Sequence, residues 1–430
     1  MQMQHQVDLF YIRSMNYKLT KEFALLLDAN DNLREYKDRF HIPLQKNGNE
    51  YIYFCGNSLG LQPKKTKELI NQELEDWANL GVEGHLNAKN PWLHYHEFLS
   101  QSFAKIVGAK KSEVVAMNTL TVNLHLMMVS FFRPTSKRYK IIIESDAFPS
   151  DIYAVESQIK FHGFKLEEAL IKLKPRNGES GIRTEDICEI IDKEGEEVAL
   201  IMLGGVNYYT GQVFDFATIT ETAHAKNIKV GFDLAHAAGN IKLELHKWQV
   251  DFAVWCSYKY LNSGPGSIAG AFIHEKHHNA DLPRFAGWWG HNKESRFNMP
   301  DNFSPIKTVE GWQLSNPPIL SLAAIRASLD IFDQVGMDSL LVKSKLMTGY
   351  LVFLLNSIQS DRIKIITPEP RGCQVSIRVI NANKKLFEQI SEKGVIADWR
   401  EPDVIRVAPA PLYNSFLDIY NFYNILIKLL

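Results

Sequence analysis

The sequence predicts an α/β protein, with a mostly parallel sheet sandwiched by helices in a large domain and a smaller α+β domain. Between residues 114 and 273, short apolar runs alternate with helical stretches, which favours parallel strands with helices on both faces. After Ser315 the pattern changes to long amphipathic helices followed by short strands alternating with helices. We expect residues 66–324 to form the large domain. Residues 1–65 and 325–430 should supply the N-terminal segment and the small domain.

The N-terminal part predicts mainly helices. Residues 16–50 predict one or two helices, because their FALLLD run supplies an apolar face. Residues 51–70 predict a short strand, a Gly/Asn/Ser turn and a helix opened by Pro63, where a missing N–H costs nothing. A loop rich in His, Asn and Trp should follow at 82–96, and a helix should run over 97–107.

The middle and C-terminal parts predict the two sheets. Residues 114–132 predict a strand and a helix that begins near Thr119 or Leu120. Further strands are predicted at YKIIIES, VALIMLGG, VGFD and DFAVWC, with helices at SDIYAVESQIKFHG, EDICEIIDKEG and FATITETAHAKN. Beyond Ser315 we expect two long helices joined at Gly336. The tail then predicts strands at CQVSIRVI and VIRVA, and helices at KLFEQISEKG and SFLDIYNFYNILIKLL.

Composition indicates a soluble globular protein, since 45% of the residues are hydrophobic and 23% are charged. A formal net charge of −1 gives no bulk attraction to nucleic acid or anionic membranes, and no apolar run approaches the ~20 residues of a membrane span. The start lacks the long apolar core of a secretory signal, and Met15 is an alternative start to Met1. Four cysteines in 430 residues make no disulfide framework, so we expect a cytoplasmic protein.

Two predicted strands end at residues suited to one kind of chemistry. VGF ends at Asp233, and DFAVWC leads to Tyr258 and Lys259. Ligands of open α/β sheets bind beyond the carboxyl ends of such strands, where a lysine loses solvation and becomes a better nucleophile. A Schiff-base lysine and an acid that pairs with a pyridinium nitrogen are what pyridoxal 5′-phosphate (PLP) requires. Alternatively, Lys259 is a surface lysine and Asp233 caps a helix. The presence of Lys259 and Asp233 together, with His236 nearby, favours the PLP interpretation.

Further residues suit the remaining parts of such a cofactor. Residues 118–121 (Asn-Thr-Leu-Thr) offer small polar groups and N–H donors at a helix start for the phosphate, unless they are only a helix cap. Tyr258 is a second candidate for the phosphate, and the SGPGS turn at 263–267 is a weaker one. Phe148, in a Phe-Pro-Ser-Asp turn at 148–151, is placed to stack on the ring, although a plain turn explains it equally well.

An arginine should hold the carboxylate of an amino-acid substrate. Arg406 lies on a predicted strand and can bind a carboxylate through two donors, and Arg400 is its nearby competitor. Cys373 is a candidate sulfur-transfer nucleophile, but a buried strand cysteine is the favoured interpretation.

No metal site is expected. The HxH pair at 94 and 96 and the histidines of HEKHH at 274–278 lack a matching ligand set, and HEKHH lacks the HExxH spacing.

Eight stretches carry a resemblance to a known family. They are YFCGNSLGLQP, MNTLTVNLH, AFPSD, VGFDLAHAAGN, VDFAVWCSYKYLN, AGAFIHEKH, LSNPPIL and RVAPAPLYNS, and they span nearly the whole chain. With them the sequence closely resembles the kynureninases, PLP-dependent enzymes of fold type I in the class V aminotransferase-like group. The resemblance implies a Schiff base at Lys259, with Tyr258 and Asp233 as its catalytic companions. The cofactor contacts that it implies are Leu120, Thr121, Phe148, Pro149, Ser150, Asp151, Asp233, His236, Tyr258, Lys259, Trp288 and Asn316.

The same resemblance implies a substrate site and two departures from the family pattern. His85 and Asn316 match positions that contact the substrate's aryl group, and Arg406 matches the arginine that holds its carboxylate. Gly204 stands where relatives often carry a small hydroxyl residue near the cofactor. A second tryptophan, Trp289, stands where animal-type enzymes have a different aromatic, which leaves open whether kynurenine or 3-hydroxykynurenine is preferred.

The resemblance also implies a reaction. Water would cleave the Cβ–Cγ bond of L-kynurenine or 3-hydroxy-L-kynurenine, giving L-alanine and anthranilate or 3-hydroxyanthranilate. Such a hydrolase of ketonic carbon–carbon bonds serves tryptophan (kynurenine) catabolism and de novo NAD biosynthesis. Lys259 would remove the Cα proton and Tyr258 would protonate Cβ. A homodimer is expected, with the second subunit completing the cleft, and His85 with Asn316 favours the hydroxylated substrate.

Two rival functions remain open. One is another PLP enzyme of this fold, such as a desulfurase or an aminotransferase, which needs an exposed nucleophilic cysteine or an α-keto acid acceptor. The other is a PLP-binding protein without catalysis, against which the set of Lys259, Asp233 and Arg406 argues.

Overall fold

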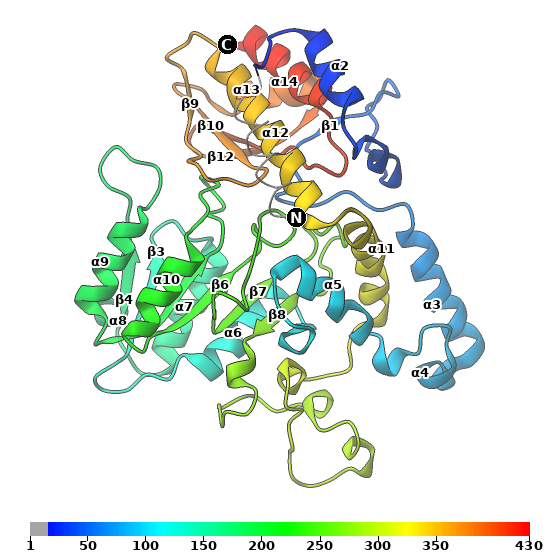
Figure 1. Cartoon of the computed structure of the whole chain (residues 1–430), viewed down its shortest axis with the longest axis vertical. Coiled ribbons are helices and arrows are strands. Elements are labelled where there is room, and N and C mark those ends of the chain that lie inside the picture. The colour runs from blue at the N-terminus through cyan, green and yellow to red at the C-terminus, as the bar shows by residue number, and fades with distance from the viewer. Residues whose placement is uncertain (1–15) are drawn as a thin grey trace.

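A computed structural model describes residues 16–430 of the chain, and the alternative starts at Met1 and Met15 lie outside this range. Its centre is a seven-stranded sheet with the strand order β2-β8-β7-β6-β5-β3-β4 (Figure 1). Neighbouring strands from β7 to β4 pair in parallel, whereas β8 and β2 add antiparallel pairs at one edge. The strands are β2 (Val114–Ala116), β3 (Lys140–Glu144), β4 (Leu170–Leu173), β5 (Val198–Gly204), β6 (Lys229–Asp233), β7 (Phe252–Trp255) and β8 (Gly270–Ile273).

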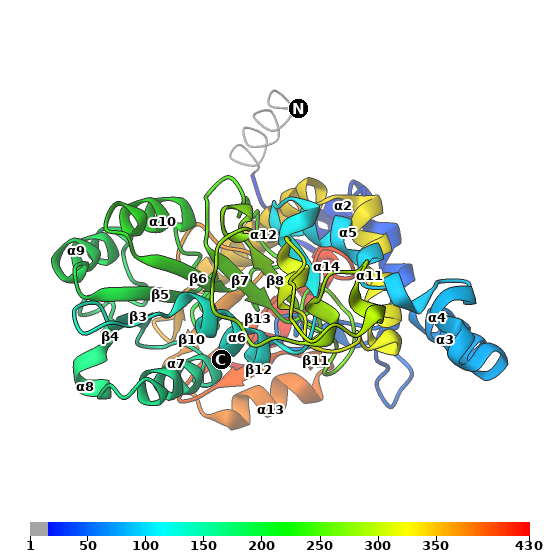
Figure 2. The same ribbon diagram turned by 90° about the horizontal axis from the view of Figure 1, so that it is seen from below.

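Helices cover both faces of this sheet, which confirms the predicted α/β fold. Figure 2 shows α9 and α10 on one face and α7 and α8 on the other. The helices around the sheet are α3 (Thr66–Leu80), α4 (Gly84–Asn87), α5 (Glu97–Val107), α6 (Leu120–Phe131), α7 (Pro149–Phe161), α8 (Leu166–Ala169), α9 (Thr184–Glu194), α10 (Phe216–Ala225) and α11 (Ile319–Val335). Short 3₁₀ turns lie between them at 81–83, 92–94, 111–113, 275–277, 288–290, 296–298 and 309–312.

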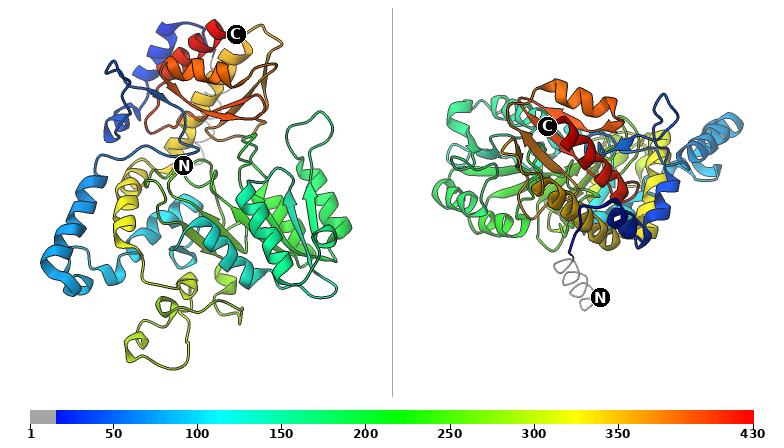
Figure 3. Two further views of the ribbon diagram at one scale, coloured as in Figure 1. Left: turned by 180° about the vertical axis from the view of Figure 1, so that it is seen from behind. Right: turned by 90° about the horizontal axis from the view of Figure 1, so that it is seen from above.

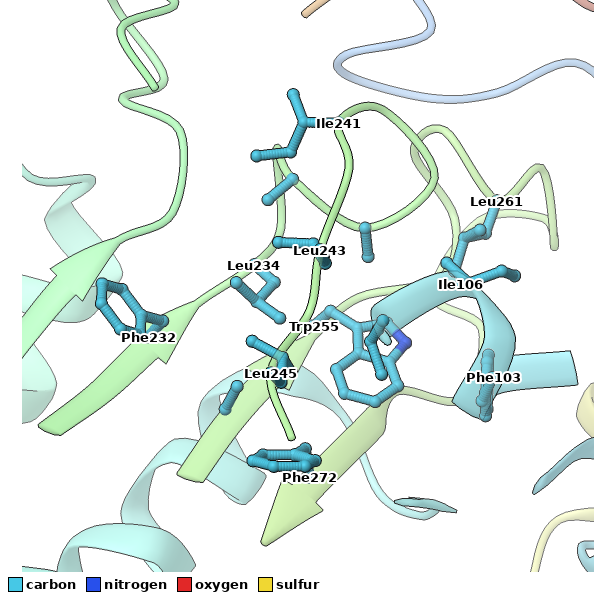
Figure 4. Packing of buried hydrophobic residues seen from close by; sticks show 14 of the residues in the cluster. Phe103, Ile106, Phe232, Leu234, Ile241, Leu243, Leu245, Trp255, Leu261 and Phe272 are labelled. Carbon is cyan, nitrogen blue, oxygen red and sulfur yellow. The ribbon is translucent and has the colours of Figure 1, made fainter. Parts of the chain in front are cut away.

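The strands are apolar on both sides because both faces of the sheet are buried. Along β7, Ala253 and Trp255 pack into the core beneath α5 and α10, and Phe252 and Val254 pack into the core beneath α6 and α7. Figure 4 shows the first of these cores, in which the Trp255 ring lies among aliphatic side chains and meets Phe103 edge-on at 5.4 Å between ring centroids. This packing fixes the two central strands, whose ends carry Asp233 and the segment leading to Lys259.

A four-stranded antiparallel sheet with the order β12-β13-β10-β9 lies at the C-terminal end of the chain. Its strands are β9 (Ile363–Ile365), β10 (Val375–Val379), β12 (Asp398–Arg400) and β13 (Val404–Val407), while β11 (Val395–Ile396) pairs in parallel with β1 (Ile52–Tyr53). The helices packed around it are α2 (Lys21–Ala29), α12 (Met337–Asn356), α13 (Lys384–Glu392) and α14 (Phe416–Leu429).

The N-terminal segment joins this smaller sheet, as Figure 3 shows from behind and from above. Helix α2 lies against α14, and the Asp28 carboxylate accepts the N–H groups of Phe416 and Leu417 at the start of α14. The division at residues 66–324 stays a prediction. In the described residues, no helix is long and apolar enough to cross a membrane.

Some element predictions need correction. The helix expected to open at Pro63 begins at Thr66, because Pro63 instead forms an isolated antiparallel bridge with Phe40. By contrast, the one or two helices predicted in residues 16–50 are present as one α-helix and the 3₁₀-helix Arg34–Arg39. Five strands were not predicted: β4, β8, β9, β11 and β12.

Candidate active site

A buried cavity opens at the carboxyl ends of the central parallel strands. Its enclosed volume is about 80 Å³, below the range of about 300–1,000 Å³ that is usual for small-molecule sites. The lining residues come from β3, β5, β6, the segment after β7 and the starts of α6 and α7. They are Leu120, Thr121, Glu144, Phe148, Ser150, Asp151, Gly204, Val206, Tyr208, Asp233, Ala235, His236, Tyr258 and Lys259.

Lys259 lies in this cavity beside His236. Its Nζ is 3.0 Å from His236 Nε2 and 5.9 Å from the centroid of the Phe148 ring. Burial, with the positive charge of Lys259 as the next cause, holds the pKa of His236 well below its usual range. His236 is therefore neutral at neutral pH and accepts the lysine's hydrogen bond at Nε2. Its proton then resides on Nδ1, which is buried without a partner.

Asp233, at the end of β6, belongs to a group of three buried acids. Burial raises its pKa, and burial together with the charge of Asp233 raises the pKa of neighbouring Asp151. Burial also raises the pKa of Glu144 to about 7, while both of its carboxylate oxygens accept the N–H of Gly204, at 3.0 and 3.3 Å. Among these acids Asp233 retains its charge most readily, since it accepts the Ala235 N–H and faces Lys259.

The other end of the cavity carries small hydroxyl groups. Thr121, in the first turn of α6, lies 3.1 Å from Ser150, in the first turn of α7, measured between their hydroxyl oxygens. Both helices thus point their N-terminal N–H groups toward this end, where an anion is favoured. Pro149 begins α7 between two lining residues without lining the cavity itself.

Trp288, Asn316 and His85 were also predicted for the site and lie outside the cavity. Trp288 is 41% exposed in a 3₁₀ turn, where its indole packs edge-on against Trp289 and Phe297. Asn316 is exposed before α11, and His85 lies half-buried in α4 with its ring edge-on to Trp92. The SGPGS turn also lines a different groove, between residues 41–70 and the start of α11.

Arg406 lies behind the cavity wall. It is 1% exposed on β13, where it donates to the backbone carbonyl of Tyr208, a lining residue, and to the carboxylate of Asp398. Burial lowers its pKa to about 10. Its competitor Arg400 lies 5.7 Å from the Tyr208 ring centroid on the neighbouring strand β12. Both arginines thus approach one wall residue.

Four lining residues had not been predicted: Glu144, Val206, Tyr208 and Ala235. Glu144 ends β3, and Val206 and Tyr208 follow β5, so the strand-end rule that selected Asp233 points to them as well. Gly204 lines the cavity as well, and a side chain there would crowd the Glu144 carboxylate, at 2.9 Å from the added Cβ. The glycine thus leaves space for the Glu144 carboxylate, where the resemblance led us to expect a small hydroxyl residue.

Two clusters of His and Glu have ligand atoms within 4.8 Å of one another in the described residues: Glu113, His246 and His274, and His96, Glu97 and Glu310. In the first, the oxygen of Glu113 that meets His246 also accepts a backbone N–H, and His274 Nδ1 accepts another. In the second, Lys293 forms salt bridges with both glutamates. These ligand atoms are already engaged within the protein.

Cys373 lies two residues before β10 and is 2% exposed. Burial raises the pKa of its thiol to about 11, and Ser344 lies 3.3 Å away. The interpretation of Cys373 as a buried cysteine is confirmed.

Comparison with known proteins gives the family. The model for the kynureninase C-terminal domain matches residues 340–426. The chain is 57% identical to the kynureninase of Myxococcus xanthus over 411 residues, covering 95% of this chain and 96% of that protein. The chain belongs to the kynureninase family. The rat kynureninase is 48% identical over 429 residues, covering 95% of this chain and 92% of that relative.

Solved structures agree with this kynureninase-family fold. The cysteine desulfurase CsdA from Escherichia coli superposes with a TM-score of 0.76 at 14% identity, covering 93% of this chain and 98% of that one. A mutant of C-DES with glycine linked covalently to its PLP cofactor gives 0.75 at 16% identity, covering 87% and 96%. At such low identity the likeness shows the fold alone, which is the predicted fold type I.

Proposed function

We propose that this enzyme hydrolyses the Cβ–Cγ bond of L-kynurenine, 3-hydroxy-L-kynurenine or both, with PLP as its cofactor. The products are L-alanine and anthranilate or 3-hydroxyanthranilate. The observation that carries this proposal is the pairing of Lys259 with His236 opposite the buried Asp233, in a chain more than half identical to a kynureninase. We further propose that the enzyme acts in the cytoplasm. Its reaction would serve tryptophan catabolism and de novo NAD biosynthesis.

The cavity suits PLP in its polarity. Two buried polar atoms facing this region, His236 Nδ1 and Asp151 Oδ1, have no partner within the described residues. An unpaired buried polar atom costs about 1–3 kcal/mol, so a polar ligand that pairs with them is favoured. Thr121 and Ser150 would hold the phosphate at the starts of α6 and α7. Asp233 would hold the protonated ring nitrogen, and Phe148 would cover the ring face.

Bound PLP would supply a protonated ring that accepts the electrons left on Cα when its proton is removed. Asp233 would keep that ring nitrogen protonated, because a buried carboxylate favours a positive charge beside it. The free amine of Lys259 takes the Cα proton. Neutral His236 lies 3.0 Å from this amine. Because His236 carries no charge, it does not compete with the protonated ring nitrogen for the Asp233 carboxylate.

Tyr258 is proposed as the acid that delivers a proton to Cβ. Burial raises the pKa of its hydroxyl, so the side chain keeps its proton at neutral pH. Such a general acid contributes about 10²–10⁴-fold to the rate. Water adds to the γ-carbonyl, and the hydrate releases the aryl acid as the Cβ–Cγ bond breaks.

We propose that the substrate's carboxylate binds Arg406 and that its aryl ring meets residues of a second copy of the chain. His85, Trp288 and Asn316 lie on surface segments away from their own cavity. A homodimer that brings these segments to the partner's cavity would complete the site. His85 and Asn316 favour the 3-hydroxylated substrate through their polar side chains.

The test supplies the purified enzyme and PLP with kynurenine and with 3-hydroxykynurenine, and follows alanine and both aryl acids. We expect both substrates to be cleaved, the hydroxylated one with the higher kcat/KM. PLP bound without release of alanine from either substrate would contradict the proposed function. An equal kcat/KM for the two substrates would contradict only the preference.

A further inference from the structure

Three charged side chains lie on one face of the small sheet. Asp398 and Arg400 are two residues apart on β12, so both point to the same side of the strand. Arg406 on β13 is the direct cross-strand partner of Asp398. Directly opposite residues of an antiparallel pair bring their Cβ atoms within about 4.5–5.5 Å, which allows the side chains to meet.

The Asp398 carboxylate joins the two arginines. One oxygen, Oδ2, accepts from Arg400 Nη2 at 3.1 Å and also from Arg406 Nη2. Asp398 is 14% exposed and Arg406 1% exposed, so this pair is well shielded from solvent and the ionic hydrogen bond is strong. Three charges of +1, +1 and −1 then leave the group with one net positive charge.

Arg406 is held on two sides but keeps unused donors. Its other terminal nitrogen donates to the backbone carbonyl of Tyr208, and its Nε is buried without a partner among the described residues. A guanidinium carries more N–H groups than these two acceptors take up. The carbonyl and Asp398 together fix the plane of the guanidinium behind Tyr208, whose side chain lines the cavity.

The wall residue Tyr208 connects this group to the catalytic centre. Its ring lies edge-on to Phe148, with 5.2 Å between centroids, and within 6 Å of both guanidinium carbons. The positive charges of Arg406 and Arg400 also contribute to the lowered pKa of His236, the partner of Lys259. The arginine pair thus lies directly behind a wall residue of the cavity that contains the amine.

We infer that Asp398 is a positioning residue for the substrate's α-carboxylate. It orients the guanidinium of Arg406 and limits the net charge of the three side chains (Asp398, Arg400 and Arg406) to +1. This inference rests on the proposed function, since it assigns Arg406 the carboxylate of the amino-acid substrate. One net charge matches one carboxylate, and a fixed plane lets that carboxylate meet two parallel N–H groups. Asp398 itself does not line the cavity.

The test compares Asp398→Asn with Asp403→Asn in the PLP-loaded enzyme. Asp403 is a matched control, because it pairs with Arg378 on the same small sheet at 3.0 Å and lines no part of the cavity. Calorimetry measures the Kd of L-alanine, which has the α-carboxylate, and of anthranilate, which lacks the amino-acid part. This readout needs no turnover.

For Asp398→Asn we expect the Kd of alanine to rise about tenfold or more and that of anthranilate to change less than about twofold. KM for kynurenine should rise in parallel, while kcat stays within about threefold. Asp403→Asn should leave both Kd values unchanged. Asp398→Glu, which keeps the charge on a longer arm, should give an intermediate value.

Three results would overturn the inference. An unchanged or lower Kd of alanine in folded Asp398→Asn would show that Asp398 does not aim Arg406 or competes with the substrate. An equal rise in Asp403→Asn would make the effect a general property of the sheet. If Asp398→Asn does not fold, a wild-type Kd in Asp398→Glu also contradicts the inference. Absence of kynurenine cleavage by the wild-type enzyme contradicts the proposed function instead, and leaves the alanine measurement interpretable.

Discussion

Lys259 and His236 share one hydrogen bond inside a buried cavity, and the direction of that bond follows from burial. The lowered pKa of His236 leaves its Nε2 as the acceptor, so Lys259 is the donor. An amine held in this way has one orientation toward the cavity. The pair supports the proposal that Lys259, four residues beyond β7, is the reactive amine, since a lysine that loses solvation is a better nucleophile than one on an exposed loop.

Substitution of this amine is the first prediction. Lys259→Ala should lower kcat by about 10²–10⁴-fold or more, since the proton acceptor at Cα is lost. Borohydride should fix no cofactor onto the variant, whereas it fixes PLP onto the wild-type enzyme. Lys247→Ala removes a lysine that is 75% exposed and pairs with Glu244, and it should behave as wild type. Full-strength labelling of Lys259→Ala would mean that another lysine holds the cofactor.

Glu144 gives a prediction about pH. Its pKa is raised from the ordinary value of 4.5 to about 7 in the folded protein, because burial disfavours its charged form. The folded state therefore binds more protons than the unfolded state between pH 4.5 and 7, and stability falls as the pH rises through this window. Above pH 7 the free energy of unfolding is lower by up to about 3 kcal/mol, because each pH unit between the two pKa values contributes about 1.4 kcal/mol.

Glu144→Gln should remove this loss. Its amide oxygen still accepts the Gly204 N–H but carries no charge to desolvate. Denaturant unfolding of the PLP-free protein at pH 5 and pH 8 should show a smaller decrease in ΔG for the variant than for the wild type. Parallel decreases in the two proteins would mean that Glu144 is not the titrating group, and that Asp151 or Asp233 carries the pH dependence.

At the scale of elements, the turn before α3 supports the lysine loop. The N–H of Gly60 donates to the carbonyl of Tyr258 at 2.8 Å, and a methyl group on Gly60 would overlap the carbonyl of Lys259 and the side chain of Asn262. The NSLG motif therefore ends in glycine because two backbones approach closely there. The N-terminal segment thereby supports the loop that carries Tyr258 and Lys259.

Gly60→Ala should destabilise the protein by about 1–3 kcal/mol and lower kcat/KM at least about tenfold, because the lysine loop must move away. The comparison variant is Gly163→Ala, where the added methyl meets nothing within 4 Å and only the positive φ is strained. It should lose stability without losing kcat. Equal kcat in both variants would show that the lysine loop tolerates displacement.

The elements that could be predicted from the sequence are those with a clear hydrophobic period, together with the side chains that end them. Asp233, Lys259 and Phe148 were found because each follows a conspicuous apolar run. The short strand β12 was missed because its three residues, Asp398–Arg400, carry two charges and depend on β13 for pairing. Glu144 also ends an apolar run, so the strand-end rule would have found it had the rule been applied to β3. The helix start at Thr66 depended on the Pro63–Phe40 bridge, a tertiary contact.

At the scale of the whole molecule, the two sheets hold one loop between them. Three successive carbonyls of the segment after β5 accept from the small sheet: that of Tyr208 from Arg406 and Gln374, that of Tyr209 from Ser376, and that of Thr210 from Thr367. This loop carries Tyr208 into the cavity wall.

The last prediction concerns assembly. His85 lies in α4, Trp288 in a 3₁₀ turn and Asn316 just before α11, and none of them lines the cavity of its own chain. The segment between β8 and α11 forms loops below the large sheet (Figure 1). If these three residues complete the cavity of a second copy, Lys259→Ala and Asn316→Ala damage opposite halves of each site. Mixed dimers then contain one doubly altered site and one intact site.

Each variant alone should be nearly inactive, and an unfolded-and-refolded equal mixture should regain up to about a quarter of wild-type activity, since half of the dimers are mixed and each has one intact site. The control pair is Lys259→Ala with Asp233→Asn. Both residues line the cavity of one chain, so every site in the mixture keeps one defect and no activity should return. Recovery in the control pair as well, or in neither pair, would contradict a site shared between subunits. Recovery confined to the pair with Asn316→Ala requires that Asn316 act on the partner's cavity, because no intact site arises otherwise.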